Sequence, residues 1–135
     1  MSNLIVLDSS IIISDLRTGC FADRLEAIDG VLRNSSVVLA ELRRGVSSRA
    51  DRKLLLELER NHPILTPTRS NWLESGQILA KIRNDRGFDG QKLRDLHFDV
   101  LIALTARSHG ARLITSNRMD FELIRDNRNF KLEVW

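Results

Sequence analysis

Three acidic side chains of this chain lie beside apolar segments that suit a protein core. Asp99 opens the apolar run 100–104, and a buried, unpaired carboxylate costs several kcal/mol. Asp8 directly follows the apolar run 4–7, and Glu41 lies beside an apolar helical stripe. Something in the folded protein must compensate the charge at these positions.

A fourth acidic group follows the apolar segment 112–115. Ser116, Asn117 and Asp120 come after that segment, just as Asp8 follows the first one. Because the carboxyl ends of parallel strands meet at one edge of a sheet, we expect these side chains to lie together. The other two acidic positions occupy helical segments that could flank the same edge.

A cluster of three or four carboxylates has a definite chemistry. The charges repel each other, and some groups would have to take up protons. A divalent cation removes that repulsion, and oxygen ligands select Mg²⁺ or Mn²⁺ over zinc. Such clusters cut or join phosphodiesters, because the metal activates water and stabilises charge on the phosphate oxygens. The pattern therefore indicates metal-dependent phosphodiester chemistry.

Each acidic position also has a simpler explanation. Asp8, Asp99 and Asp120 could each cap a helix that begins beside it, and Glu41 could form an ion pair with Arg44. A helix start near residue 98 would favour the Asp99 charge by about 0.3–1 kcal/mol, which offsets only part of a desolvation cost. The four positions together indicate a site more strongly than any one of them.

Short strands alternating with longer helices are predicted to position these groups. Strands are expected at 4–7, 31–32, 64–65, 112–115 and 131–135, and helices at 11–16, 22–28, 37–44, 49–60, 70–86, 98–108 and 121–124. Ser35 or Ser36 can cap the helix of Glu41, and Asn71 with Glu74 has the spacing of a capping box. The order indicates an α/β fold with a parallel sheet and helices on both faces.

The composition suits one compact domain over residues 1–135. No segment approaches the roughly 20 apolar residues of a membrane helix, and no signal peptide is evident, so we expect a cytoplasmic protein without a membrane partner. The single cysteine, Cys20, excludes an internal disulfide and a Cys-based zinc site. A net charge of +3 and a pI near 9.6 are compatible with nucleic acid. Arginines cluster at Arg43, Arg44, Arg49 and Arg52, and again at Arg118, Arg125 and Arg128.

Four segments in this order resemble the PIN-domain family. They are "IVLDSSIII", "SSVVLAELRRGV", "HFDVLIALTARSHGARLITSNRMDFELI" and "FKLEVW", and the resemblance extends over residues 3–135. The chain is most similar to the VapC-type toxin ribonucleases of type II toxin–antitoxin pairs. The resemblance implies a PIN-like, Rossmann-like parallel sheet and a Mg²⁺- or Mn²⁺-dependent endoribonuclease. It also implies a homodimer and a cognate antitoxin that masks the site.

The resemblance also implies roles for the acidic positions. Asp8, Glu41 and Asp99 match the family's catalytic acids, and Asp120 matches an acid often found before Phe. Asp8 and Asp99 would hold the main metal, while Glu41 and Asp120 would complete its ligands or position the attacking water. Asn117 occupies a position where the family carries Asp or Asn, so either Asn117 or Asp120 fills the fourth place. The cut would leave a 3′-hydroxyl and a 5′-phosphate.

Polar neighbours complete the expected site. Ser10 and Thr115 could orient the metal ligands through hydrogen bonds. Arg43, Arg44 and Arg118 could contact RNA phosphates.

Two other functions are compatible with parts of the pattern. A phosphatase with Asp8 as nucleophile would need a second carboxylate two residues later, where Ser10 stands. A non-catalytic RNA- or protein-binding module with a residual acidic pocket is favoured by Asn117, which carries no charge. RNA cleavage by the native chain and by Asp99→Asn would distinguish the enzyme from the binding module.

Overall fold

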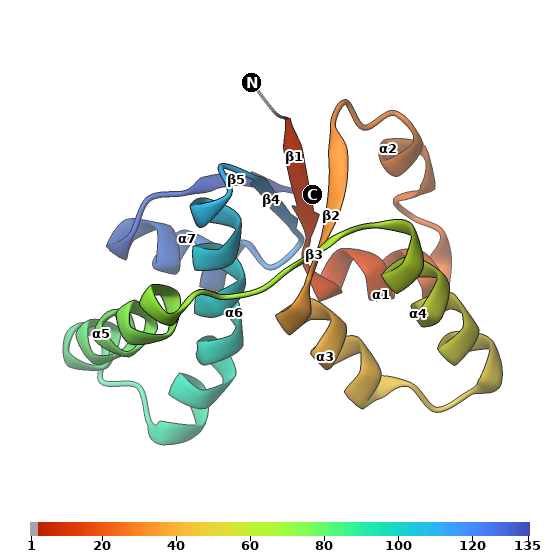
Figure 1. Ribbon diagram of the computed structural model, residues 1–135. Coiled ribbons are helices and arrows are strands. Elements are labelled where there is room, and N and C mark those ends of the chain that lie inside the picture. Colours follow the sequence, from red (N-terminus) through yellow and green to blue (C-terminus); the bar gives the residue numbers. More distant parts are fainter. Residues whose placement is uncertain (1–2) are drawn as a thin grey trace.

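The computed structural model describes residues 3–135 as one α/β arrangement of strands and helices (Figure 1). In chain order the elements are β1 (Leu4–Leu7), α1 (Ser9–Thr18), α2 (Ala22–Glu26), β2 (Val31–Ser35), α3 (Ser36–Gly45), α4 (Arg49–Asn61), β3 (Ile64–Leu65), α5 (Arg69–Arg86), α6 (Gly90–Ser108), β4 (Arg112–Thr115), α7 (Arg118–Asn127) and β5 (Lys131–Val134).

The five strands form one parallel sheet in the order β3-β2-β1-β4-β5. From the central strand β1 the chain first builds outward through β2 to β3, and then crosses to the other side of β1 to add β4 and β5. The direction of winding therefore reverses between β1 and β4, where Ile5 is in register with Arg112. In open parallel sheets, the carboxyl ends of two such strands enclose a crevice where ligands bind.

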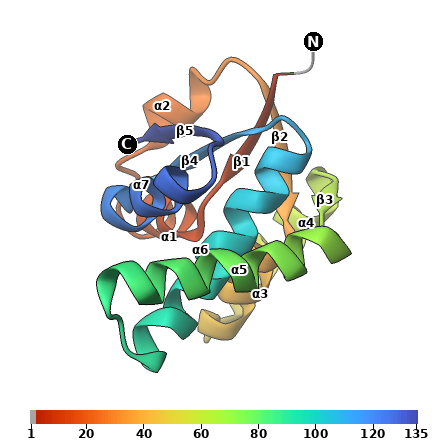
Figure 2. The same cartoon turned by 90° about the vertical axis from the view of Figure 1, so that its left-hand side faces the viewer.

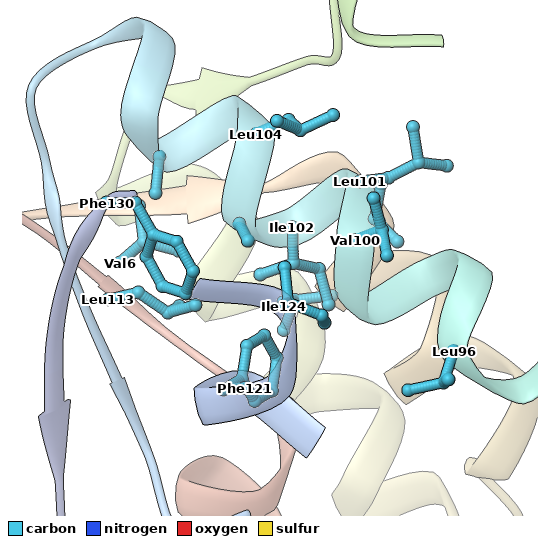
Figure 3. Close-up of a cluster of buried hydrophobic side chains, with 14 of the residues drawn as sticks. Val6, Leu96, Val100, Leu101, Ile102, Leu104, Leu113, Phe121, Ile124 and Phe130 are labelled. Atoms are coloured by element: carbon cyan, nitrogen blue, oxygen red, sulfur yellow. The ribbon is translucent and has the colours of Figure 1, made fainter. Parts of the chain in front are cut away.

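Alternate residues of the central strands supply two separate apolar cores. Val6 and Leu113 join the larger core with residues of α3, α5, α6 and α7, much of which Figure 3 shows in close-up. Ile5 and Ile114 point to the opposite face, where they pack with Ile11 of α1. Figure 1 shows α5 and α6 on one side of β1 and α1 and α2 on the other. The predicted parallel sheet with helices on both faces is therefore confirmed.

The helix α6 begins earlier than the sequence pattern predicts. It starts at Gly90, not near Phe98, because Asp89 caps it by accepting a hydrogen bond from the backbone N–H of Lys92 at 2.9 Å. Asp99 consequently lies in the middle of the helix, away from the favourable potential of its N-terminus. The capping explanation for Asp99 is wrong, and its charge needs another partner.

Helix α5 packs against α6, as Figure 2 shows. A capping box opens α5, but Thr68 is its cap and Asn71 its reciprocal partner, so the predicted pairing of Asn71 with Glu74 was wrong. Thr68 was overlooked because it precedes the predicted helix 70–86 by two residues.

Ser35 caps α3, as one of the two predicted alternatives.

Among residues 3–135, none of the helices combines the length and the apolarity needed to span a bilayer.

Candidate active-site cleft

A cleft of about 600 Å³ opens beside the ends of β1 and β4. It therefore lies at the reversal of the sheet, where a ligand site is expected. Predicted site residues from four distant parts of the chain line it, namely Asp8, Ser10, Glu41, Arg44, Asp99 and Asn117. Asp120, Arg43, Arg118 and Thr115 do not line this cleft.

Asp8 is the most deeply buried acid of the cleft, with 3% of its surface exposed. Its backbone N–H donates to the carbonyl of Ile114 at 2.9 Å, which fixes the residue at the junction of β1 and β4. The carboxylate oxygen Oδ2 accepts hydrogen bonds from Ser10 Oγ and Thr115 Oγ1, each at 2.8 Å. The other oxygen, Oδ1, is buried without a hydrogen-bond partner in the described residues. An orphaned buried oxygen is costly, so it indicates a missing ligand.

The helix-capping explanation for Asp8 does not account for this geometry. Asp8 precedes α1 as its cap residue, yet its side chain makes no capping hydrogen bond. Ser10 and Thr115 are instead tied to the following turn, since Ser116 N–H donates to Ser10 Oγ at 3.2 Å and Asn117 N–H donates to Thr115 Oγ1 at 3.0 Å. These contacts support the orienting role that was predicted for both hydroxyls.

Asp99 enters the cleft from the middle of α6. Burial, together with the charges of Asp8, Glu41 and Asp120, raises the pKa of its carboxyl to about 8, although the charge of Lys92 lowers it. Asp99 therefore keeps a proton near neutral pH unless a cation replaces it.

Glu41 enters from α3 and is half-buried. Burial raises the pKa of its carboxyl, with a further increase from Asp8, whereas the hydrogen bond from Ser9 and the charge of Arg44 lower it. The Ser9 Oγ to Glu41 Oε1 distance is 3.4 Å. The Arg44 guanidinium lies over the Phe98 ring, 5.7 Å from its centroid, and still acts on Glu41 through its charge.

The fourth position is divided between two residues. Asn117 lines the cleft and caps α7 by accepting from Asp120 N–H at 3.4 Å, so the cap of α7 is Asn117 and not Asp120. Asp120 accepts hydrogen bonds from Asn117 Nδ2 at 3.1 Å and from Lys92 Nζ at 3.0 Å. Asp120 thus lies behind Asn117 and acts on the cleft through its charge.

Comparison with known proteins identifies the family of this chain. The PIN-domain model matches residues 5–126, which is most of the sequence. The chain belongs to the PIN-domain family. The predicted family is thereby confirmed, and no match is found among curated proteins.

Solved structures have the same fold as this PIN domain. A chain of VapBC2 from Rickettsia felis, bound to a promoter DNA fragment, is 24% identical with a TM-score of 0.75, and the match covers 98% of both chains. A chain of VapBC-1 from nontypeable Haemophilus influenzae is 23% identical with a TM-score of 0.73, again over 98% of both chains. A chain of DNA-bound VapBC from Salmonella typhimurium is 24% identical with a TM-score of 0.72, over 100% of this chain and 99% of that one.

The three arginines predicted to meet RNA differ in their positions within the PIN domain. Arg43 forms an ion pair with Glu59 of α4 at 2.6 Å, and Arg118 forms one with Glu122 at 2.9 Å. Arg44 alone of these three lines the cleft.

Five polar residues of the cleft were not among the predicted site residues, namely Ser9, Ser14, Gln91, Arg94 and Asp95. Gln91 and Arg94 of α6 line it together with Phe98 and Asp99. Their three- and four-residue spacing puts them on one face of a helix, and this signal was missed because the helix start was placed too late.

The acidic residues fit a hydrated Mg²⁺ or Mn²⁺ ion better than a fully enclosed metal. Within residues 3–135, no three His, Cys, Asp or Glu side chains form a ready-made metal cage. Mg²⁺ usually keeps several waters and takes only one or two carboxylates from a protein. The orphaned Asp8 Oδ1 and the neighbouring Asp99 can provide such ligands.

Proposed function

We propose that this PIN domain is a Mg²⁺- or Mn²⁺-dependent endoribonuclease and the toxin of a toxin–antitoxin pair. The observation that carries the proposal is the buried Oδ1 of Asp8, which has no hydrogen-bond partner within residues 3–135, beside Asp99, whose pKa is raised by burial and by neighbouring carboxylates. The cleft at the reversal of the sheet and the fold shared with chains of VapBC complexes also support it.

Asp8 and Asp99 would hold the cation, and Glu41 would position the attacking water. When bound, the cation lowers the pKa of a water molecule and stabilises negative charge on the phosphate. Asp99 gives up its proton on binding. Glu41, with its raised pKa, is suited to accept a proton from the attacking water. Cleavage of the bond between phosphorus and the 3′ oxygen, with a proton from solvent water passing to the leaving oxygen, would leave a 3′-hydroxyl and a 5′-phosphate.

The remaining residues of the cleft would position RNA. Arg44 and Arg94 supply positive charge at its wall, where a phosphate group could bind beside the carboxylates. Arg43 and Arg118 would have to leave their glutamate partners to do the same.

An antitoxin partner, a homodimer and a cytoplasmic location complete the proposal. Support for the partner comes from similar solved structures, which include a toxin–antitoxin complex from Klebsiella pneumoniae and a VapBC toxin–antitoxin system from Mycobacterium tuberculosis.

The decisive experiment compares RNA cleavage by native protein, Asp99→Asn and Asp126→Asn, with Mg²⁺, with Mn²⁺ and with a chelator. Asp126 is an exposed acid of α7 and serves as a matched control. We expect cleavage by the native chain and the control only with a metal ion, and a loss of at least about 100-fold for Asp99→Asn. Equal cleavage by Asp99→Asn would refute the assignment. RNA binding without cleavage by any of the proteins would support the non-catalytic module instead.

A further inference from the structure

Lys92 stands at an electrostatically unfavourable place in α6. It belongs to the first turn of the helix, where the positive end of the helix dipole disfavours a cation, and that turn holds no acidic residue. Two contacts with other parts of the chain nevertheless hold its ammonium group. Asp120 Oδ1 lies 3.0 Å away, and the Phe88 ring centroid lies 5.8 Å away. The lysine is therefore held by contacts outside its own helix.

The Lys92–Asp120 pair satisfies Asp120 without any metal. Lys92 takes one carboxylate oxygen and the Asn117 amide takes the other, at 3.0 and 3.1 Å. The pair is partly exposed, at 39% and 19% of the two side chains, and such pairs add only about 0–1 kcal/mol to stability. Stability alone gives little reason to keep a lysine at the wrong end of a helix.

The pair also acts on the proposed metal ligands. Lys92 and Asp99 are seven residues apart on α6, so they lie two turns apart on the same face. The charge of Lys92 lowers the pKa of Asp99, while the charge of Asp120 raises it. The Lys92 ammonium thus reduces the negative potential that the Asp120 carboxylate would otherwise impose on Asp99.

We propose that Lys92 is a fixed cation that neutralises Asp120 in place of a second metal, so that the chain binds one divalent ion through Asp8 and Asp99. The inference rests on the proposed function, because it takes that metal site as given. Asp120 then serves as the anchor of Lys92, and Lys92 is a positioning residue that sets the number of ions bound.

The test counts Mn²⁺ ions bound to metal-free protein without RNA, from the electron paramagnetic resonance signal of free Mn²⁺ up to millimolar concentration. The native chain should bind one ion and Lys92→Met two. Lys92→Met combined with Asp120→Asn should bind one, since the second ion needs the Asp120 carboxylate. Lys92→Arg, which keeps the charge, and Lys81→Met, which removes an exposed lysine of α5, should each bind one. Circular dichroism melting identifies any variant that fails to fold, and in that case Lys92→Gln replaces Lys92→Met.

Two ions on the native chain would overturn the inference and leave the proposed metal-dependent nuclease intact. One ion on folded Lys92→Met or Lys92→Gln would also overturn the inference, because Lys92 would then not prevent the binding of a second ion. Loss of the single ion in Lys92→Met combined with Asp120→Asn would make Asp120 a direct ligand and also overturn it. No ion on the native chain would overturn both the inference and the proposed metal dependence.

Discussion

Asp8 and Asp99 keep their places in the cleft by different means. The hydroxyl groups of Ser10 and Thr115 fix Asp8 through one of its oxygens. Asp99 instead tolerates burial by holding a proton up to a pH of about 8, because its pKa is raised. A cation would therefore bind to one acid that is already oriented and to another that must first ionise.

The protonation of Asp99 makes the stability of the metal-free protein depend on pH. The pKa of the Asp99 carboxyl is 3.8 in the unfolded chain and about 8 in the folded protein. Between these two pH values the folded protein holds a proton that the unfolded chain has lost. The contribution of this proton to the free energy of unfolding is fully present below pH 3.8 and is lost as pH rises through about 8. We expect the Tm of the native chain to fall across this window relative to Asp99→Asn, whose amide does not ionise. Parallel curves of Tm against pH for the two proteins would contradict the prediction.

The hydroxyl of Thr115 should matter more for metal binding than for stability. Thr115→Val removes a donor to Asp8 Oδ2 while keeping the shape of the side chain. Loss of a group that orients a metal ligand typically weakens metal affinity or activity 10- to 100-fold. Calorimetric titration with Mn²⁺ would measure the effect, with Thr66→Val at an exposed position as the control. Equal Mn²⁺ affinities for native protein and Thr115→Val would show that Asp8 needs no such support.

The adjacent arginines of α3 provide a test of how RNA enters the cleft. Arg44 lines the cleft, whereas Arg43 is engaged with Glu59. We expect Arg44→Ala to weaken RNA binding. The slope of log K against log salt should also become shallower by about the amount of one phosphate contact. Arg43→Ala should change both quantities little. Fluorescence anisotropy in the presence of a chelator would measure both, because the RNA then stays uncut. A larger effect of Arg43→Ala would place RNA outside the cleft.

At the level of single elements, α6 combines the core with the candidate site. Its apolar residues Val100 and Ile102 are completely buried, and Figure 3 shows them within the larger core. The same turn of the helix carries Asp99 into the cleft. Dense packing around these neighbours limits the movement of the carboxylate, which is the condition for a well-oriented metal ligand.

The start of α6 shows where local sequence patterns stop being sufficient. The glycines and charges of residues 87–95 favour a loop, and the continuous apolar run from residue 100 favours a helix. Burial of Leu96 and partial burial of Leu93 against the core extend the helix back to Gly90. Tertiary packing thus decided the boundary, and with it the electrostatic surroundings of Asp99.

Truncation of Ile102 should destabilise the whole fold. The side chain is fully buried in the larger core, and Ile→Ala at such a position costs about 2–5 kcal/mol. Leu73 of α5 is 66% exposed, so Leu73→Ala should change the free energy of unfolding by less than about 0.5 kcal/mol. Urea denaturation of both variants would measure the difference. Similar values would mean that the core does not depend on α6 as described.

At the level of the whole molecule, the parallel sheet could be predicted but its strand order could not. Hydrophobic runs and capping residues are local signals, and they located Asp8 at a strand end and Glu41 and Asp99 on helices. The pairing of β1 with β4 joins residues far apart in sequence, and no local pattern encodes it. The same pairing places Asn117 in the lining of the cleft and Asp120 outside that lining, in contact with Lys92.

The reversal between β1 and β4 has a consequence for the newly made chain. Asp8 and Thr115, which share a hydrogen bond, are 107 residues apart, so the ribosome makes Asp8 long before it makes the partner of that residue. A ribosome that has translated Asp8, Glu41 and Asp99 has still to translate β4, which supplies both Thr115 and the carbonyl that holds the Asp8 backbone. The cleft therefore assembles only after β4 has been translated. For a nuclease of the proposed kind, made in the midst of the RNA it would cut, the strand order delays activity until β4 has been translated and has paired with β1.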